Sequence, residues 1–385
     1  MNNTKAYRTR HEFHKPATKL PLAEDFIIGL DAGYSGMKVW YENGYFCFPS
    51  YARKITGIET LNLFDDKDIL YRDGDTGEVY MIGYTAQEMA APGDTNDTNA
   101  ESSGRKRYWN TKFQILCKAA IGICLLSRAK DDERPVFLET GLPASYVKGD
   151  SQSMINALSK KMNFSLKIGK QPWADIKTII NKEKIHIMPQ PAGALYSSLI
   201  SSNGKYANNA KQTLYGKVLV GDFGSGTADF YGFRNRQISC CESLTNIGGG
   251  EIIKRVCDMI LSEYGEDIRE QALQHNLETG YITCFNEETM QQEEKPINDF
   301  VKKASDEVFA EAMERSKSAT NSFRDYEKLI IAGGTGEAWM PKIREYLSGM
   351  KSLEIVPANI TDVSIPLFYS VARGYYLYRY TLTRH

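Results

Sequence analysis

Residues 218–231 read "VLVGDFGSGTADFY", and residues 27–41 read "IIGLDAGYSGMKVWY". In each stretch an apolar run ends at an aspartate, a glycine-rich turn follows, and a second apolar run begins. The stretches align when Asp31 is set on Asp222 and one extra residue, Tyr34, is allowed in the first turn. The alignment then pairs Gly33 with Gly224 and Ser35-Gly36 with Ser225-Gly226. The chain therefore builds one strand–turn–strand unit twice.

These turns predict a phosphate site. Glycines after a buried strand let several backbone N–H groups point into one concavity, because no Cβ blocks the approach, and such concavities bind phosphate oxygens. An aspartate beside a phosphate requires a cation, and Mg²⁺ takes oxygens from phosphates and from waters that one or two carboxylates hold. Asp31 and Asp222 suit that water-mediated role, and Lys38 would offset phosphate charge. Two such turns, one from each of two domains, would clasp the β- and γ-phosphates of a nucleotide.

A third glycine turn lies in "IIAGGTGEAW", residues 330–339, between an expected strand and an expected helix. Gly333 and Gly334 would let the backbone lie against a flat ring, so the turn predicts an adenine or ribose contact. None of the three turns is a GxxxxGK[ST] loop or a GxGxxG fingerprint, and each alone could be only a tight turn. Three together, two of them repeats, are much more specific.

Size and composition set the class of protein. A chain of 385 residues with 42% apolar and 25% charged residues predicts a soluble protein of two or more domains. A net charge of −1 argues against whole-surface attraction to nucleic acid or anionic lipid. Seven cysteines without CxxC pairs predict free thiols in a reducing compartment and no zinc site. With no apolar run long enough to span a bilayer, we expect a cytoplasmic protein with no membrane partner.

The order of elements predicts an α/β class with four parts. We expect a flexible polar arm at 1–24, domain I at 25–215 with a small inserted subdomain at about 51–108, domain II at 216–357, and a C-terminal segment at 358–385 that returns to domain I. In the local pattern, Glu42-Asn43-Gly44 predicts a hairpin turn, and 110–128 predicts a helix. Three minor interpretations are that "QQEEKP" at 291–296 is a charged loop, that His186 is a packed core residue, and that Arg105–Arg107 is a solvated helix entry or filament contact rather than a nucleic-acid site.

The motif order "DAGYSGMK", "PQPAGAL", "GDFGSGTADF", "AGGTGEAW" resembles the superfamily of actin, sugar kinases and heat-shock chaperone ATPases. Within it, "FPS" (48–50), "MIGYTAQ" (81–87), "ETGLPASYV" (139–147) and "VARGYYLY" (371–378) are most similar to the ParM-type bacterial plasmid-segregation actins. The resemblance implies an actin-like (ribonuclease H-like) fold. It has two similar domains, each with a mixed five-stranded sheet and flanking helices, around a nucleotide cleft.

The resemblance also implies roles for residues of this chain. The phosphate 1 motif comprises Asp31, Gly33, Tyr34, Ser35, Gly36 and Lys38; phosphate 2 comprises Asp222, Gly224, Ser225, Gly226 and Thr227; the adenosine motif comprises Gly333, Gly334 and Thr335. Gly249, Lys254 and Arg255 match positions where relatives contact the nucleoside. The catalytic set is Gln190, Asp31 and Asp222, with Mg²⁺ held by the two aspartates.

Gln190 stands where relatives carry a Gln or Glu that positions the attacking water. A neutral amide is no strong base, but it can orient a water in line with the γ-phosphate, which is most of what phosphoryl transfer asks of a protein. ParM-like proteins tend to carry Glu there, so Gln190 implies slower or differently timed hydrolysis. The alternative is that Gln190 only caps the helix that begins near Pro191.

The implied function is hydrolysis of ATP or GTP with Mg²⁺, coupled to head-to-tail filament assembly that segregates plasmid DNA. A ParR-like DNA-binding adaptor on a centromere-like site would be the partner, without direct nucleic-acid binding. One alternative is a small-molecule kinase, which would need an aspartate base aimed at a substrate hydroxyl. Others are a static cytoskeletal filament and a chaperone ATPase, although no peptide-binding β-domain follows here.

Overall fold

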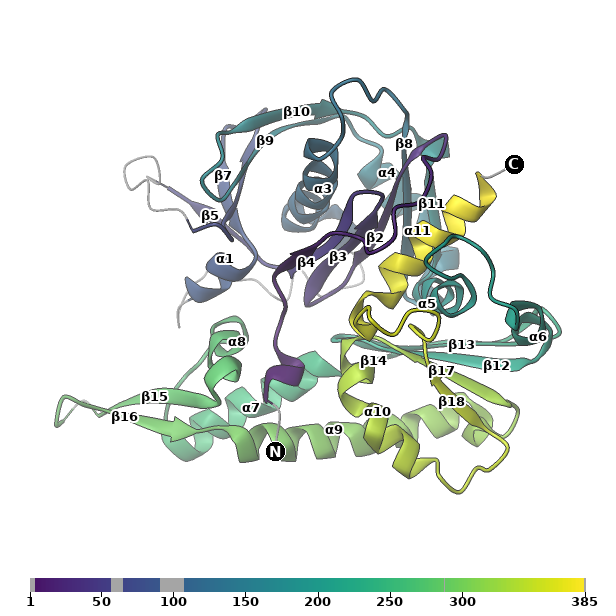
Figure 1. Ribbon diagram of the computed structural model, residues 1–385. Helices are drawn as coiled ribbons and strands as arrows, with labels where there is room; N and C mark the ends of the chain where they lie inside the picture. Colours follow the sequence, from purple (N-terminus) through teal and green to yellow (C-terminus); the bar gives the residue numbers. More distant parts are fainter. Residues whose placement is uncertain (1–3, 57–64, 91–106, 287, 384–385) are drawn as a thin grey trace.

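The repeated sequence unit forms an antiparallel strand pair at the centre of each of two sheets (Figure 1). A computed structural model describes residues 4–56, 65–90, 107–286 and 288–383. The first pair is β2 (Phe26–Ala32) with β3 (Gly36–Tyr41), and the second is β12 (Lys217–Phe223) with β13 (Thr227–Arg234). In register, Asp31 lies opposite Lys38, and Asp222 lies opposite Asp229.

The two main sheets share one topology. Domain I runs β4-β3-β2-β8-β11, and domain II runs β14-β13-β12-β17-β18; in each, the first two pairings are antiparallel and the last two parallel. The remaining strands of these sheets are β4 (Gly44–Pro49), β8 (Val136–Leu142), β11 (Ile185–Pro189), β14 (Gln237–Thr245), β17 (Lys328–Ala332) and β18 (Glu354–Pro357). The predicted α/β class, with a mixed sheet and flanking helices in each domain, is therefore confirmed.

Domain I departs from the expected five strands, because the N-terminal arm adds a sixth. Strand β1 (Glu12–His14) pairs antiparallel with β4 at the sheet edge. The arm is therefore not the flexible tail expected from its polar composition: η1 (Thr4–Tyr7) and β1 both lie against the body of the protein.

A third sheet forms a small subdomain on domain I, in the order β10-β9-β6-β7-β5. Strands β5 (Ala52–Ile55), β6 (Ile69–Asp73) and β7 (Val79–Ile82), with helix α1 (Tyr84–Glu88), come from the expected insertion. The other two strands, β9 (Met162–Ile168) and β10 (Ala174–Thr178), come from much later in the chain. The insertion expected at about 51–108 therefore contains only three of the five strands. The sheet continues through β9, which pairs with β6.

Helices flank these sheets, and one of them, α5, contacts the sheets of both domains. The helices are α3 (Thr111–Leu126), α4 (Val147–Leu158), α5 (Gln190–Leu199), α6 (Ala210–Tyr215), α7 (Gly249–Tyr264), α8 (Glu270–Thr279), α9 (Asn298–Ala319), α10 (Gly334–Tyr346) and α11 (Ser370–Leu382). Helix α3 begins after Asn110, whose side chain accepts a hydrogen bond from the Lys112 N–H, as its N-cap chemistry predicts. Helix α11 packs on α5 and on β2, so the end of the chain lies against domain I.

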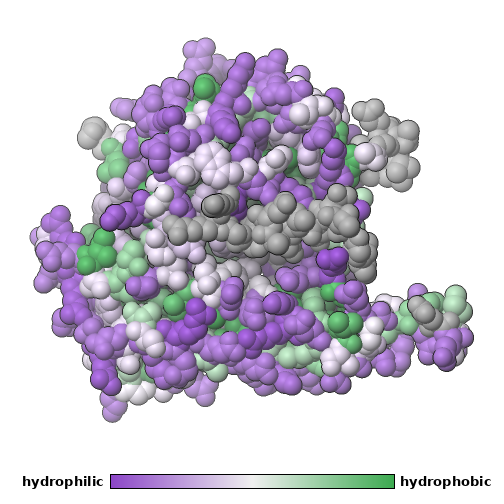
Figure 2. Space-filling view, turned by 180° about the vertical axis from the view of Figure 1, so that it is seen from behind, coloured by the Kyte–Doolittle hydropathy of each residue, from purple (hydrophilic) through white to green (hydrophobic). Residues whose placement is uncertain are grey.

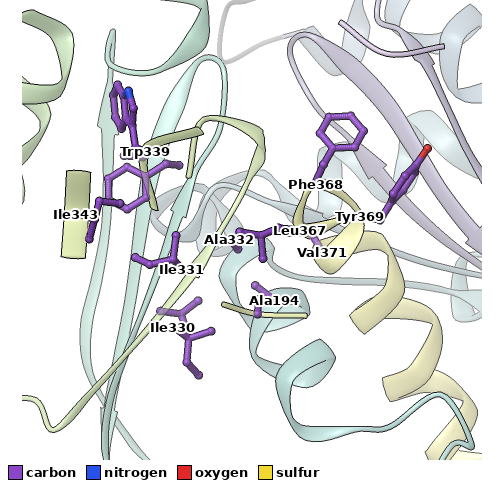
Figure 3. Packing of buried hydrophobic residues seen from close by; sticks show 14 of the residues in the cluster. Ala194, Ile330, Ile331, Ala332, Trp339, Ile343, Leu367, Phe368, Tyr369 and Val371 are labelled. Carbon is purple, nitrogen blue, oxygen red and sulfur yellow. The ribbon is translucent and has the colours of Figure 1, made fainter. Parts of the chain in front are cut away.

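The largest buried cluster extends from domain II into the base of the cleft (Figure 3). Ile331 and Trp339 from domain II are fully buried in it, together with Ala194 of α5 and Val371 of α11. Burial of apolar area at about 25 cal/mol per Å² is the main stabilising contribution here. The cluster thus joins the two domains.

A two-stranded hairpin, β15 (Tyr281–Asn286) with β16 (Gln291–Pro296), projects from domain II (Figures 1 and 2). The stretch "QQEEKP" is therefore a strand rather than the expected loop. Its polar side chains are compatible with a strand because nearly all of them are exposed. In the described part of the chain, no helix is long and apolar enough to cross a membrane.

Two further interpretations were wrong. His186 is not a core residue: its side chain is 49% exposed, and its Nδ1 lies 2.5 Å from Oε1 of the buried Glu139, a contact that raises the pKa of His186. Arg107 is not solvated either, because it is buried and donates to the carbonyl oxygen of Ala32. Arg105 and Lys106 lie outside the described residues.

Candidate functional site

The three glycine turns meet at one cavity of about 670 Å³ between domains I and II. Among the sequence-predicted residues, those that line it are Asp31, Gly33, Tyr34, Ser35, Gly36, Lys38, Gln190, Asp222, Gly224, Ser225, Gly226, Thr227, Gly249, Lys254, Gly333, Gly334 and Thr335. Residues from both halves of the sequence thus line a single cavity.

Asp31 is the centre of the domain I side. It is buried at the end of β2, where the Lys38 ammonium on β3 donates to its Oδ2 (2.7 Å). The amide nitrogen of Gln190, the first residue of α5, donates to its Oδ1 (3.1 Å). The α5 N-terminus carries no side-chain cap, so the geometry gives Gln190 a role at Asp31 rather than as a helix cap.

Asp222 is the corresponding carboxyl on the domain II side. Burial raises its pKa to about 8, and the nearby charges of Asp31 and Asp229 add to the shift. Two neighbouring buried carboxylates repel each other, and a hard divalent cation relieves such repulsion. Asp31 and Asp222 therefore fit Mg²⁺. In the described residues no group of three or more His, Cys, Asp or Glu forms a metal site, so other ligands would be waters and phosphates.

Sequence reasoning missed the role of Asp229, whose buried carboxylate joins the two domains. Its Oδ2 accepts from the Thr227 hydroxyl (2.6 Å), and its Oδ1 accepts from the backbone N–H of Ala144 in domain I (3.0 Å) and from the Ser243 hydroxyl. An aspartate within the otherwise apolar run of β13 was the available signal, since a buried charge needs partners.

Thr335 connects the adenosine turn to the second phosphate turn. Its hydroxyl donates to the carbonyl oxygen of Gly224 (2.7 Å) and accepts from the N–H of Gly249 at the start of α7 (2.9 Å). Gly333, two residues earlier, has φ of +85°, and a Cβ there would lie 2.1 Å from the Phe223 carbonyl oxygen. Only glycine fits that position.

Tyr34, the extra residue of the first turn, fills the space between the two phosphate turns. The Arg107 guanidinium lies 4.1 Å from its ring centroid on the domain I side. Across the cleft, a Cβ on Gly226 would lie 2.6 Å from the same ring. Tyr34 is therefore a contact between the domains as well as part of the cavity wall.

The two cations expected on α7 have different positions. Lys254 lines the cavity. Arg255 does not: its guanidinium donates to Glu251 and to both carboxylate oxygens of Glu311 (2.9 Å each) on α9. Neighbouring carboxylates hold the Arg255 guanidinium, and the nucleoside contact expected of Arg255 stays a prediction.

Part of the wall was not expected at all. Residues 6–10 of the N-terminal arm line the cavity, as do Gln271 and Gln274 of α8 and Phe368, which lies just before α11. These residues carry no motif, and they lie far from the glycine turns in sequence, so only the fold brings them to the site.

Comparison with known proteins agrees with this architecture. Residues 29–193 match the family model described as the actin-like proteins N-terminal domain. A comparison with curated protein sequences finds no match. The chain has the actin-like fold, and the expected likeness to ParM and other bacterial actin homologues is confirmed.

Particular solved structures are similar over nearly the whole chain. A non-polymerisable quadruple mutant of pCBH ParM is 18% identical with a TM-score of 0.72, covering 92% of this chain and 99% of its own. A ParM from a 15-stranded filament of Clostridium botulinum is 17% identical with a TM-score of 0.67, covering 92% and 98%. Ta0583, an archaeal actin homologue solved with ADP, is 17% identical with a TM-score of 0.61, covering 91% and 98%.

Proposed function

We propose that the chain binds ATP or GTP together with Mg²⁺ in this cavity, hydrolyses the nucleotide, and assembles head-to-tail with further copies of itself. The observation that carries the proposal is the convergence of two duplicated turns and an adenosine-type turn on one cleft between two similarly built domains. The fold supports general ATPase activity, and a structural neighbour was solved with ADP.

Each group has a defined task in this proposal. The glycine turns and Lys38 hold the β- and γ-phosphates, and Mg²⁺, when bound, would neutralise phosphate charge. Because Asp31 fixes the amide nitrogen of Gln190, the amide oxygen is left to accept a hydrogen bond from water. That water attacks the γ-phosphorus, the bond to the β-phosphate oxygen breaks, and the water protons pass to phosphate or solvent. Positioning, rather than base strength, is what the site supplies.

Assembly is the second half of the proposal. Among the structural neighbours are a ParM filament and a filament of the protein Alp12. We propose that this chain likewise forms filaments in the cytoplasm that move plasmid DNA through a ParR-like adaptor bound to a centromere-like site. A net charge of −1 favours such an adaptor over direct DNA binding.

The test combines pelleting, light scattering and phosphate release, with ATP or GTP and with or without Mg²⁺. We expect polymer that depends on triphosphate and Mg²⁺, followed by phosphate release, and filaments in electron micrographs. Transfer of phosphate to a small acceptor by a monomer would support the kinase alternative instead. Polymer that forms equally without nucleotide would support a static filament.

A further inference from the structure

The N-terminal arm runs from domain II to domain I (Figure 1, from the N label to β4), and its residues 6–10 line the cavity. On domain II, the Thr4 hydroxyl donates to the buried Leu277 carbonyl oxygen (2.7 Å). The Tyr7 hydroxyl lies 2.6 Å from Ser305 Oγ, which the indole N–H of Trp339 also reaches (3.3 Å). The arm therefore begins firmly on domain II.

The other end is attached to domain I. Strand β1 pairs with β4, and the Phe13 ring stacks on Phe46 with centroids 5.3 Å apart. Glu12 accepts a hydrogen bond from the Tyr369 hydroxyl (3.0 Å). Residues 8–11 must therefore bridge whatever gap separates the domains, and the domains cannot move apart without stretching or detaching them.

Thr9 lies in the middle of this bridge and contacts both domains. Its backbone N–H donates to Gln274 of α8 in domain II (2.8 Å), and its hydroxyl donates to Gln87 of α1 in domain I (2.9 Å). The Gln87 amide in turn donates to Gln271 of α8 (2.6 Å). The arm thus reinforces the contact between α1, in the inserted subdomain of domain I, and α8 of domain II.

The inner side of the bridge faces the cavity. Residues 6–10 belong to the lining, and the Arg10 guanidinium lies 4.8 Å from the Phe368 ring while donating to Glu337 of α10 (2.8 Å). Lys38 lies 5.0 Å from the same ring. A nucleotide held by the glycine turns therefore lies behind the arm, close to a second cation.

We infer that residues 4–14 form a strap that closes the nucleotide cleft and controls nucleotide exchange. This inference rests on the proposed nucleotide site. Opening of the cleft requires the loss of several hydrogen bonds at once, at Thr4, Tyr7 and Thr9, and each bond makes a separate contribution to the barrier. The strap makes exchange slow while the domains are closed, which ties release of the spent nucleotide to domain opening.

The test removes the strap hydroxyls without changing side-chain volume, in the triple variant Thr4→Val, Tyr7→Phe, Thr9→Val. The full-length protein, below its assembly concentration, is loaded with a fluorescent N-methylanthraniloyl ATP and chased with excess ATP in a stopped-flow instrument. We expect release at least tenfold faster than in the wild-type protein. Thr18→Val, an exposed position beyond β1, is the matched control and should stay within twofold. A triple variant that also stays within twofold overturns the strap.

A second readout separates failure of the strap from failure of the nucleotide site. Hydrogen exchange of the α1 and α8 amides, measured without nucleotide, should be faster in the triple variant, since the strap holds these helices together. If the wild-type protein binds no nucleotide, the proposed function fails while this comparison still decides the strap. Unchanged exchange in α1 and α8 refutes the strap whatever the nucleotide result, and near-ultraviolet circular dichroism checks that the variant is folded.

Discussion

Single residues determine the proposed chemistry, and Gln190 gives the sharpest test. Its amide is held by Asp31 and is neutral, so it can orient water but cannot remove a proton. We expect Gln190→Ala to preserve nucleotide-dependent assembly and to slow phosphate release about 100-fold, since misplacement of a reacting group costs about that much. Light scattering and a phosphate-release assay on the same sample check both parts. The control Gln190→Glu keeps a water-orienting oxygen and should retain measurable hydrolysis; equal rates in wild type and Gln190→Ala would contradict the role.

Asp222 tests the assignment of the second phosphate turn. Its buried carboxyl lies beside Asp31, and together they fit the proposed Mg²⁺. We expect Asp222→Ala to abolish hydrolysis at all Mg²⁺ concentrations, whereas Asp258→Ala, on α7 and outside the cavity lining, should leave turnover unchanged. Steady-state phosphate release against Mg²⁺ concentration is the measurement. Normal turnover in Asp222→Ala would show that this turn does not hold the cation.

The contact between Tyr34 and Gly226 predicts a rescue. A Cβ at Gly226 would lie 2.6 Å from the Tyr34 ring, so Gly226→Ala must push the two phosphate turns apart. Overpacking of this kind costs about 1–3 kcal/mol, and we expect nucleotide affinity to fall by about tenfold or more. Adding Tyr34→Ala removes the clash and should restore part of the loss, because neighbouring substitutions are not additive. Isothermal titration of the single and double variants checks this; additive losses would argue against the contact.

At the scale of elements, the N-terminal arm carries a titratable group inside its docked segment. The His11 ring finds no hydrogen-bond partner among the described residues, and burial lowers its pKa to about 4, with Lys67 adding to the effect and Asp68 and Asp65 opposing it. The unfolded or detached arm binds the proton more readily. Stability therefore falls as the pH drops from about 6.5 toward 4, by at most about 3 kcal/mol.

This pH dependence should disappear in His11→Phe, which keeps an aromatic ring without a titrating group. Thermal unfolding at several pH values between 4.5 and 7.5, together with hydrogen exchange of the arm, is the measurement. His14→Gln, in the same arm, is the control and should lose stability with falling pH much as the wild-type protein does. A His11→Phe variant with an unchanged pH profile would show that His11 does not control docking of the arm.

The arm and the small subdomain also show where sequence reasoning stops. The glycine turns were predictable because each is a local signal: several glycines directly after an apolar strand, with an aspartate at the end of the strand in two of the three. The arm has polar residues and no pattern, and its partners, such as Leu277, Ser305 and Glu337, lie about 270 to 330 residues away. Strands β9 and β10 were missed for the same reason, since their place in a sheet depends on pairing with β6. Long-range contacts of this kind leave no local periodicity to read.

At the scale of the whole molecule, the duplication explains why the site could be predicted better than its surroundings. The two main sheets share one topology, and their equivalent turns line the same cavity. Asp31 and Asp222 are related by that repeat, and their positions in the cleft follow from it. The repeat does not determine the contacts of Arg255 and Asp229. The first is held by Glu311 on α9, and the second bonds to Ala144 in the other domain. Departures from the repeat are where the chain connects its two halves.

The crossing of α5 and α11 holds the C-terminal segment against domain I, beside the buried cluster that the two domains share, and it depends on two glycines. A Cβ on Gly374 would lie only 1.7 Å from the Gly193 carbonyl oxygen, so the backbones touch. We expect Gly374→Ala to separate the helices and to destabilise the protein by about 3 kcal/mol or more, because backbone atoms cannot move aside as a flexible side chain can. Since both helices belong to the cluster shared by the domains, the loss should appear as one cooperative shift.

Calorimetry and urea unfolding of Gly374→Ala give the size of that loss. Gly349→Ala is the matched control: a Cβ there meets no described atom within 4 Å, so stability should change by no more than about 0.5 kcal/mol. If the domains unfold in two separate transitions in Gly374→Ala, the crossing is what makes the molecule one cooperative unit. A Gly374→Ala protein as stable as the control would mean that the two helices can separate without cost, and the close backbone contact would then not stabilise the molecule.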